Sequence, residues 1–339
     1  MRFLPRGLAD VADGMARRDF IALAGGAVAW TVAARAQAMP LIGYLGSESP
    51  QRYGSRLSAF RDGLAQTGYA EGRSTVAIEF RWAEGQYAQL PALAKELANR
   101  QVAAMVAAGG AEVALAAKAA TATIPIVFEM GGDPIALGVV DSLSRPGGNL
   151  TGVTSLSVEV SRKSLEFMLE VRPGSKVFAV AINPTSTTSN SQLTNLHAAA
   201  ESLGVSLVVL KTSSEEEFDG MFAAARDSQA GGLVFSSDPY FAYRSQQLAE
   251  LAVRHGVPAM TQSRDFTLAG GLMSYGGDFS QSHRNAGIYA GRILKGEKPA
   301  NLPVQRVTKV ELFINLRAAD ALGLHFPSSL LGSADRVIE

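Results

Sequence analysis

Polar and acidic side chains recur in this sequence directly after short apolar runs, and this recurrence is its main indication of chemistry. Each apolar run is predicted to be a buried strand, so each polar group stands where a strand ends. The candidate ligand-binding residues are Ser47, Glu48, Gly110, Ala111, Glu112, Asp133, Asn183, Asp238, Tyr240, Arg264 and Tyr275. Such groups suit reversible capture of a small polar molecule by hydrogen bonds.

Several of these residues have a second interpretation, in which they only shape the backbone. Asp133 and Asp238 each precede a proline and are therefore also typical turn formers. An aspartate at a helix start is often an N-cap. Gly109 and Gly110 form either an anion-binding helix N-terminus or a tight turn between a strand and a helix. The sequence leaves these alternatives open.

The residue combinations that mark most enzymes are missing from the sequence. It contains no cysteine, no Gly-x-Ser-x-Gly element and no glycine motif for nucleotide phosphates. Its histidines are scattered, with no second histidine or carboxylate at metal-ligand spacing: His197, His255, His283 and His325. We therefore predict that the protein is not an enzyme, has no catalytic residues, and uses neither a metal nor a cofactor.

The polar residues need a scaffold that brings strand ends together, and the apolar pattern predicts one. Predicted strands and helices alternate through the first part of the chain, over residues 41–45, 53–67, 74–80, 90–99, 102–107, 109–120 and 124–128. This alternation is the signature of a parallel sheet with helices on both faces. In such sheets ligands bind beyond the carboxyl ends of the strands.

The same alternation of predicted strands and helices resumes after residue 154. Strands are predicted at 176–182, 206–210, 232–235 and 257–261, and helices at 161–171, 192–203, 215–226 and 242–255. The remainder is predicted as a strand at 272–275, a helix at 279–294, an extended segment at 299–307, a strand at 312–315 and a helix at 316–322. Because this remainder is too long for a loose tail, we expect it to cross back between two lobes.

The expected fold class is α/β, with two doubly wound parallel-sheet lobes joined by a multi-strand hinge. Residues 39–152 and 277–302 are assigned to lobe 1, and residues 153–276 and 303–339 to lobe 2. Residues 124–154 are central to this arrangement. They are predicted to form the last strand of the first lobe, a ligand-facing loop from Glu129 to Pro134, and the crossing. We expect Trp82, placed on a connection after a strand, to pack in the core.

The N-terminal residues 1–38 are predicted to be an export signal. Arg17 and Arg18 precede an apolar stretch from Phe20 to Ala34, and Ala36-Gln37-Ala38 fits a cleavage site after Ala38. The paired arginines also resemble a twin-arginine signal. We therefore expect an exported, periplasmic protein that begins near Met39, with either Met1 or Met15 as the start of the precursor.

The charge balance favours no polyanionic partner. The 339 residues include 31 lysines and arginines and 31 aspartates and glutamates. A protein of this balance shows no electrostatic preference for nucleic acid or for an anionic membrane surface. We expect a monomer whose partner is a small-molecule ligand.

Five segments together resemble one family, the ABC-transporter substrate-binding proteins of the aromatic-amino-acid (tryptophan/tyrosine) type, which have a type I periplasmic-binding fold. The segments are Phe60–Tyr69, Glu79–Gly85, Ile124–Phe128, Asp133–Val153 and Phe313–Leu316. The most specific part is Arg-Pro-Gly-Gly-Asn-Leu-Thr-Gly-Val at residues 145–153. The likeness extends from about Leu41 to the C-terminus.

The resemblance implies a periplasmic receptor that closes on its solute and delivers it to the membrane permease of an ABC importer. In such receptors small polar residues and backbone amides of the first lobe hold a ligand carboxylate, and acids hold an ammonium group. Ser47 and the segment 109–112 match the first role, and Asp238, followed by Asp133, matches the second. Glu112 departs from the pattern, because an acid stands where a small hydroxyl residue is expected. The rival functions are a periplasmic sensing module and an exported enzyme.

Overall fold

The computed structural model describes residues 39–72, 75–155 and 160–339. The predicted export segment, with Arg17, Arg18 and the cleavage site after Ala38, lies outside the described residues. Residues Leu41–Glu339 form one compact unit. Within the described ranges, no helix is both long enough and apolar enough to cross a bilayer.

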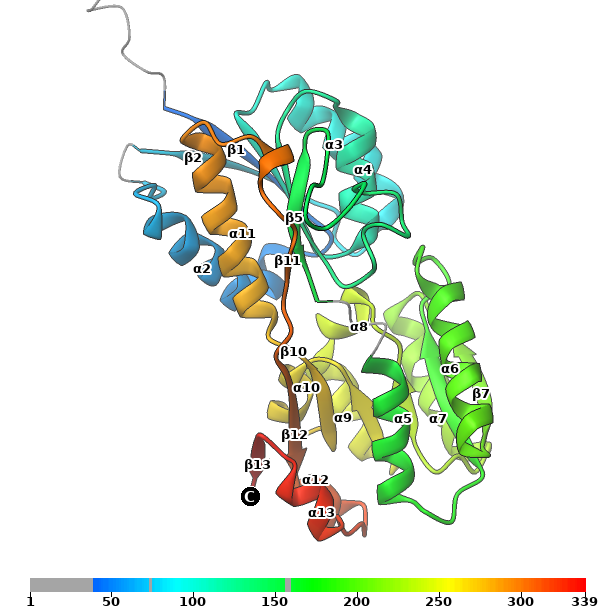
Figure 1. Ribbon diagram of the computed structural model, residues 1–339. Coiled ribbons are helices and arrows are strands. Elements are labelled where there is room, and N and C mark those ends of the chain that lie inside the picture. The colour runs from blue at the N-terminus through cyan, green and yellow to red at the C-terminus, as the bar shows by residue number, and fades with distance from the viewer. Residues whose placement is uncertain (1–38, 73–74, 156–159) are drawn as a thin grey trace, which may run out of the picture. The chain divides into compact units, whose positions relative to one another are not determined.

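A six-stranded, wholly parallel sheet forms one side of this unit, in the order β11-β5-β4-β3-β1-β2. Its strands are β1 (Leu41–Gly46), β2 (Ala77–Trp82), β3 (Ala104–Ala108), β4 (Ile126–Met130), β5 (Leu150–Thr154) and β11 (Gln305–Arg306). Figure 1 shows α2 (Pro50–Gln66) and α11 (Phe279–Leu294) on one face, and α3 (Leu90–Asn99) and α4 (Ala111–Ala120) on the other. The short 3₁₀ helix η1 (Tyr87–Gln89) precedes α3.

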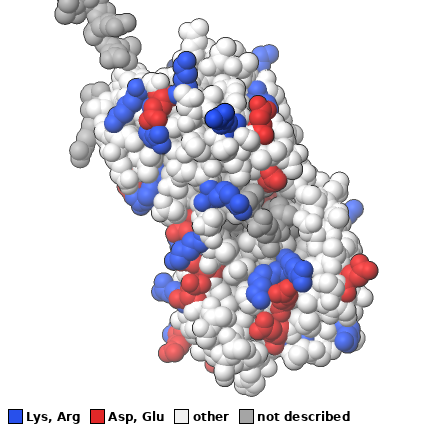
Figure 2. Space-filling model, in the orientation of Figure 1, with Lys and Arg blue, Asp and Glu red and all other residues white. Residues whose placement is uncertain are grey.

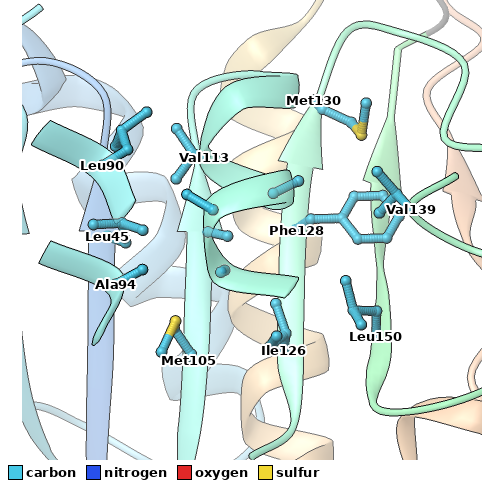
Figure 3. Close-up of a cluster of buried hydrophobic side chains, with 14 of the residues drawn as sticks. Leu45, Leu90, Ala94, Met105, Val113, Ile126, Phe128, Met130, Val139 and Leu150 are labelled. Carbon is cyan, nitrogen blue, oxygen red and sulfur yellow. The ribbon is translucent and has the colours of Figure 1, made fainter. Parts of the chain in front are cut away.

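The central strands β1, β3 and β4 are almost wholly apolar, with Glu129 of β4 as the exception, because helices cover both faces of the sheet. Figure 3 shows one of the two cores, where Ile126, Phe128 and Leu150 of the strands meet Leu90 and Val113 of the helices. All of these side chains are buried. The sheet is thereby a rigid base for the loops that follow its strands.

On the other face, α2 and α11 cross at glycines. A Cβ on Gly63 would lie 1.9 Å from the backbone oxygen of Arg284, and one on Gly287 would lie 2.1 Å from the backbone oxygen of Phe60. Only glycine permits so close an approach. The contact fixes α11, which comes late in the chain, against the first sheet.

A seven-stranded sheet forms the other side, in the order β13-β12-β10-β9-β8-β6-β7. Its strands are β6 (Val177–Ile182), β7 (Ser206–Lys211), β8 (Leu233–Phe235), β9 (Ala259–Thr261), β10 (Met273–Gly277), β12 (Val310–Asn315) and β13 (Arg336–Ile338). The accompanying helices are α5 (Val160–Val171), α6 (Ser189–Leu203), α7 (Phe218–Asp227), α8 (Pro239–Ala242), α9 (Ser245–His255), α10 (Arg264–Leu268), α12 (Leu316–Ala321) and α13 (Ser328–Gly332). The pair β10–β12 is antiparallel and the other neighbouring pairs are parallel.

Within the described residues the chain passes between the two sheets three times. These connections follow β5, β10 and β11, and Figure 1 shows the last two side by side at the waist of the unit. The predicted α/β class with two mostly parallel sheets is confirmed. The division into lobes by residue number stays a prediction, although β5 ends at Thr154 and so extends past residue 152 in the first sheet.

Helix 90–99 and helix 279–294 have the predicted bounds. Most other predicted bounds differ from the observed ones by one to three residues, and two of these differences change the interpretation of a residue. The strand predicted at 124–128 runs from Ile126 to Met130, so Glu129 belongs to the strand, where it pairs with Ala108, and not to the following loop. Trp82 ends strand β2 rather than lying on a connection, and it packs as expected, with its ring 5.6 Å from that of Phe80.

Candidate functional site

A cleft lies beyond the carboxyl ends of the strands, between the two sheets. Its empty space, including the part open to solvent, is about 740 Å³. The first sheet and its helices supply Arg56, Gly109, Gly110, Ala111, Glu112, Glu129, Gly131, Gly132, Phe279 and His283. The second supplies Ser186, Thr188, Gln192, Phe235–Pro239, Phe241–Tyr243 and Thr261–Ser263. The lining therefore combines aromatic rings with few charged groups.

The glycine turn before α4 brings the chain close to the cleft. Gly109 and Gly110 have φ angles of 100° and 119°, and their N–H groups both donate to the backbone oxygen of Glu129 at 3.3 Å. A Cβ on Gly109 would lie 2.0 Å from the Tyr53 hydroxyl and 2.3 Å from Ser47 Oγ. The structure therefore supports the tight-turn interpretation of this pair, because positive φ and close packing both require glycine.

Glu112 at the start of α4 reaches across the cleft. Its Oε1 accepts hydrogen bonds from Thr187 N at 2.7 Å, Thr187 Oγ1 at 3.0 Å and Ser186 Oγ at 3.0 Å. Both partners follow β6 of the second sheet. The departure noted at this position thus has a structural explanation, because the carboxylate joins the two sides of the cleft.

Asp238 on the second side is buried and already engaged by protein donors. Its Oδ1 accepts a hydrogen bond from Tyr240 N at 2.7 Å, so that Asp238 is the N-cap of α8. The same oxygen accepts a hydrogen bond from the Tyr87 hydroxyl at 2.9 Å. Burial, together with the nearby Glu112 carboxylate, raises the pKa of Asp238 to about 7. An acid with this pKa carries only a partial negative charge at neutral pH.

The raised pKa of Asp238 predicts a pH dependence of folding. The folded state binds this proton more tightly than the unfolded chain, so the stabilisation is complete below about pH 4 and is lost as pH rises through about 7. In the Asp238→Asn variant this contribution is absent. We expect the stability of the variant relative to wild type to rise by roughly 3 kcal/mol, several degrees in Tm, between pH 4.5 and 8.5. Thermal unfolding of both proteins across this range measures the difference, and parallel curves would contradict the assignment.

Arg56 is a buried cation at the cleft wall. It lies on the inner face of α2, and its guanidinium carbon is 4.2 Å from the centroid of the Tyr243 ring and 4.9 Å from that of Phe279. Its closest carboxylate contact is 3.5 Å, from Nη2 to the half-exposed Asp265. Contact with two rings holds the guanidinium in place, and this long ion pair leaves capacity for an anionic group of a ligand.

Two further buried side-chain atoms on the lining lack a hydrogen-bond partner within the described part of the chain. They are Ser263 Oγ, which follows β9, and His283 Nε2, which projects from α11. Both residues are 1% exposed. Since buried polar atoms are nearly always paired, these two atoms favour a site that is completed by a ligand.

Ion pairs beside the cleft join its two sides as well. Arg244 Nη1 lies 2.9 Å from Glu48 Oε1, and the two side chains are 6% and 1% exposed. Arg244 Nε also contacts Glu215 at 2.9 Å, and Arg52 of α2 contacts the same carboxylate at 2.8 Å. We call these four residues the interlobe ion network.

The structure places four of the predicted site residues on the cleft lining: Gly110, Ala111, Glu112 and Asp238. The other seven lie outside it: Ser47, Glu48, Asp133, Asn183, Tyr240, Arg264 and Tyr275. Ligand contact stays a prediction for all of them.

Each of those seven has an observed packing or hydrogen-bonding partner. Ser47 lies under the glycine turn, and Glu48 and Tyr240 contact Arg244. Asp133 is exposed and accepts from the backbone of Ile135 and Ala136. Asn183 Oδ1 accepts from Thr185, Arg264 pairs with Asp278 and Glu311, and Tyr275 packs on Phe167.

Sequence reasoning missed Arg56 and His283 as site residues, and it named Glu129 only as the first residue of a ligand-facing loop. Arg56 has a signal that would have found it, because it occupies the apolar spacing of α2 with Tyr53, Leu57 and Phe60. His283 stands four residues after Phe279 on the buried face of α11. A charged or titratable group on an apolar helix face is the relevant pattern.

Comparison with known proteins gives a family match over most of the chain. The family model described as "ABC transporter substrate binding protein" matches residues 48–338. A relative named tyrosine-binding protein, from Clostridioides difficile strain R20291, is 25% identical over 266 residues, which are 78% of this chain and 75% of the relative.

Solved structures share the fold. A conserved domain protein from Vibrio cholerae is 25% identical in sequence, with a TM-score of 0.80. The superposition includes 88% of this chain and 99% of that chain. An ABC domain from Streptococcus pneumoniae in complex with L-Trp is 24% identical with a TM-score of 0.78, at the same coverage.

Proposed function

This chain belongs to the family of ABC transporter substrate-binding proteins, and from that premise we propose that its solute is an aromatic amino acid or a close analogue. The chain is a solute-binding receptor with a type I periplasmic-binding fold. The observation that carries the proposed solute is the cleft itself, where the cation of Arg56 is held against the aromatic rings of Tyr243 and Phe279.

The chemistry of the lining supports an amino-acid-like solute. A guanidinium suits a carboxylate because it presents several N–H donors in one plane. Phe235, Phe241, Tyr243 and Phe279 offer apolar and aromatic surface to a ring. The tyrosine-binding relative supports the same class of solute.

We propose that the solute is captured by hinge closure and passed to an ABC permease, with no chemical change. Hydrogen bonds such as those of Glu112 already join the two sides of the cleft. The described residues hold no cluster of histidines and carboxylates suited to a metal ion. The rival roles of a sensing module and an exported enzyme have no observation here that favours them.

We propose further that the receptor is exported to the periplasm after cleavage behind Ala38 and acts there as a monomer. The mass of the exported chain reports where it begins. Figure 2 shows basic and acidic side chains interspersed over the visible face, which gives no support to a polyanionic partner such as nucleic acid.

Direct binding tests the proposed solute. With L-tyrosine or L-tryptophan at about 100 times Kd, the folded state should gain about 2.7 kcal/mol and Tm should rise by several degrees. Thermal unfolding with a panel of amino acids, sugars and aromatic acids checks this. A rise with a non-aromatic solute and none with the aromatic amino acids would overturn the proposal. Mass spectrometry of solute that co-purifies with the protein gives an independent reading.

A further inference from the structure

Glu129 and His283 face each other on the first side of the cleft. Glu129 stands near the carboxyl end of β4, and His283 projects from the adjacent α11. The two residues are 4% and 1% exposed, and both line the cleft. Glu129 Oε2 and His283 Nε2 are 3.9 Å apart.

The other nitrogen of His283 fixes which atom carries the hydrogen. Nδ1 lies 2.8 Å from the backbone oxygen of Phe279. Because a carbonyl oxygen can only accept, Nδ1 must donate. Burial is the main cause that lowers the pKa of His283, against an opposing effect of Glu129, so the ring is neutral. Nε2 therefore presents a lone pair.

Glu129 presents a second acceptor to the same space. Its Oε1 accepts from Ser282 Oγ at 2.9 Å. Among the described residues none donates a hydrogen bond to Oε2. Two acceptors thus lie 3.9 Å apart with no donor between them, and a buried arrangement of this kind is unfavourable until a donor is supplied.

We propose that Glu129 Oε2 and His283 Nε2 form a subsite for a primary ammonium group of the solute. An ammonium carries three donors and a positive charge, so it satisfies both acceptors and compensates the carboxylate. Arg56, on the same side of the cleft, is then left for a solute carboxylate. This inference rests on the proposed function only for the other parts of the solute, which are its aromatic ring and its carboxylate.

The subsite differs from the expectation that Asp238 holds the ammonium. Tyr87 and Tyr240 already donate to Asp238 Oδ1, and Asn183 Nδ2 donates to Oδ2 at 3.5 Å. For Glu129 Oε2, residues 39–72, 75–155 and 160–339 supply no such donor. The open acceptor pair is therefore the better match to a cationic donor.

A pair of matched ligands tests the subsite. The probes are L-tyrosine and hydroxyphenylpropionate, which lacks the ammonium group but keeps the ring and the carboxylate. We expect Glu129→Gln to weaken L-tyrosine by about 10-fold or more and hydroxyphenylpropionate by less than about 2-fold. Isothermal titration calorimetry gives both ratios. Equal losses for the two probes would overturn the subsite.

Two more variants guard against a folding defect. His283→Leu removes the second acceptor without leaving a buried charge, and it should show the same selective loss. Glu96→Gln makes the same chemical change at an acid of α3 that is 56% exposed and pairs with Arg81 away from the cleft, and it should leave both affinities unchanged. A variant that is less stable than wild type should bind both probes more weakly by the same factor. The ratio of the two affinities within one variant therefore reports the subsite and not the stability.

The subsite and the proposed solute can fail separately. If neither aromatic probe binds wild type but another amine-bearing solute does, and Glu129→Gln weakens it, then the proposed solute is wrong and the subsite stands. If the solutes that bind lack an amine, or bind Glu129→Gln as tightly as wild type, the subsite is wrong. A panel in which no amine-bearing solute binds also overturns it.

Discussion

Replacing Arg244 by methionine is expected to lower the affinity of the receptor for its solute by at least about 30-fold. The reason is the buried pair that Arg244 forms with Glu48, at 2.9 Å and with both side chains almost fully covered. Removing one partner of such a pair leaves an uncompensated buried charge, at a cost of roughly 3–5 kcal/mol.

The loss should appear in binding because the pair joins the two sides of the cleft. Glu48 follows β1 of the first sheet, and Arg244 precedes α9 beside the second. Opening the cleft gives Glu48 access to water, so the variant avoids the buried charge by opening rather than by unfolding. If about 2 kcal/mol of this cost is added to the free energy of closing the cleft, the ratio of closed to open receptor drops about 30-fold. The apparent affinity for the solute then drops by the same factor.

A double-mutant cycle separates this role from a general effect on folding. Glu48→Gln combined with Arg244→Met removes both charges, and we expect it to recover much of the affinity that the single variants lose. Arg254→Met is the matched control, because Arg254 lies in the last turn of α9 with a side chain 65% exposed. A large fall in Tm with unchanged affinity would show that the pair stabilises the fold instead.

Much of the scaffold was predictable from local pattern. Helix α11 has the predicted bounds because apolar residues recur at helical spacing from Phe279 to Leu294 and Asp278 caps its start. Strand ends were placed within two residues in most cases, so Glu112 and Asp238 were found by their position after strands. The rule that ligands meet the carboxyl ends of parallel strands carries this success.

The arrangement of the site depends on packing that no local pattern records. Glu129 and His283 are 154 positions apart in the printed sequence, and the crossing of α2 with α11 at Gly63 and Gly287 brings the second helix to the first sheet. Asp133 shows the opposite failure. It follows a strand as a ligand residue should, yet it is exposed and caps its own turn.

Replacing Arg56 by methionine is expected to have the largest effect on binding, about 100-fold for L-tyrosine. Arg56 is the guanidinium on the cleft lining, and hydrogen bonds between charged groups in buried sites contribute about 1.5–3 kcal/mol each. Methionine keeps the apolar stem against Tyr243 and Phe279, so the fold should lose little. Arg56→Lys keeps the charge without the planar set of donors, and we expect an intermediate loss.

L-tyrosinamide supplies the comparison that assigns the effect to a carboxylate, because its amide carries no negative charge while its ring and ammonium are unchanged. Its affinity should fall far less than that of L-tyrosine in Arg56→Met, as measured by calorimetry. Arg61→Met is the control on the same helix, since Arg61 is 43% exposed and pairs with Glu71 on the surface. Equal losses for L-tyrosine and its amide would mean that Arg56 supports the rings of the cleft and does not bind the carboxylate.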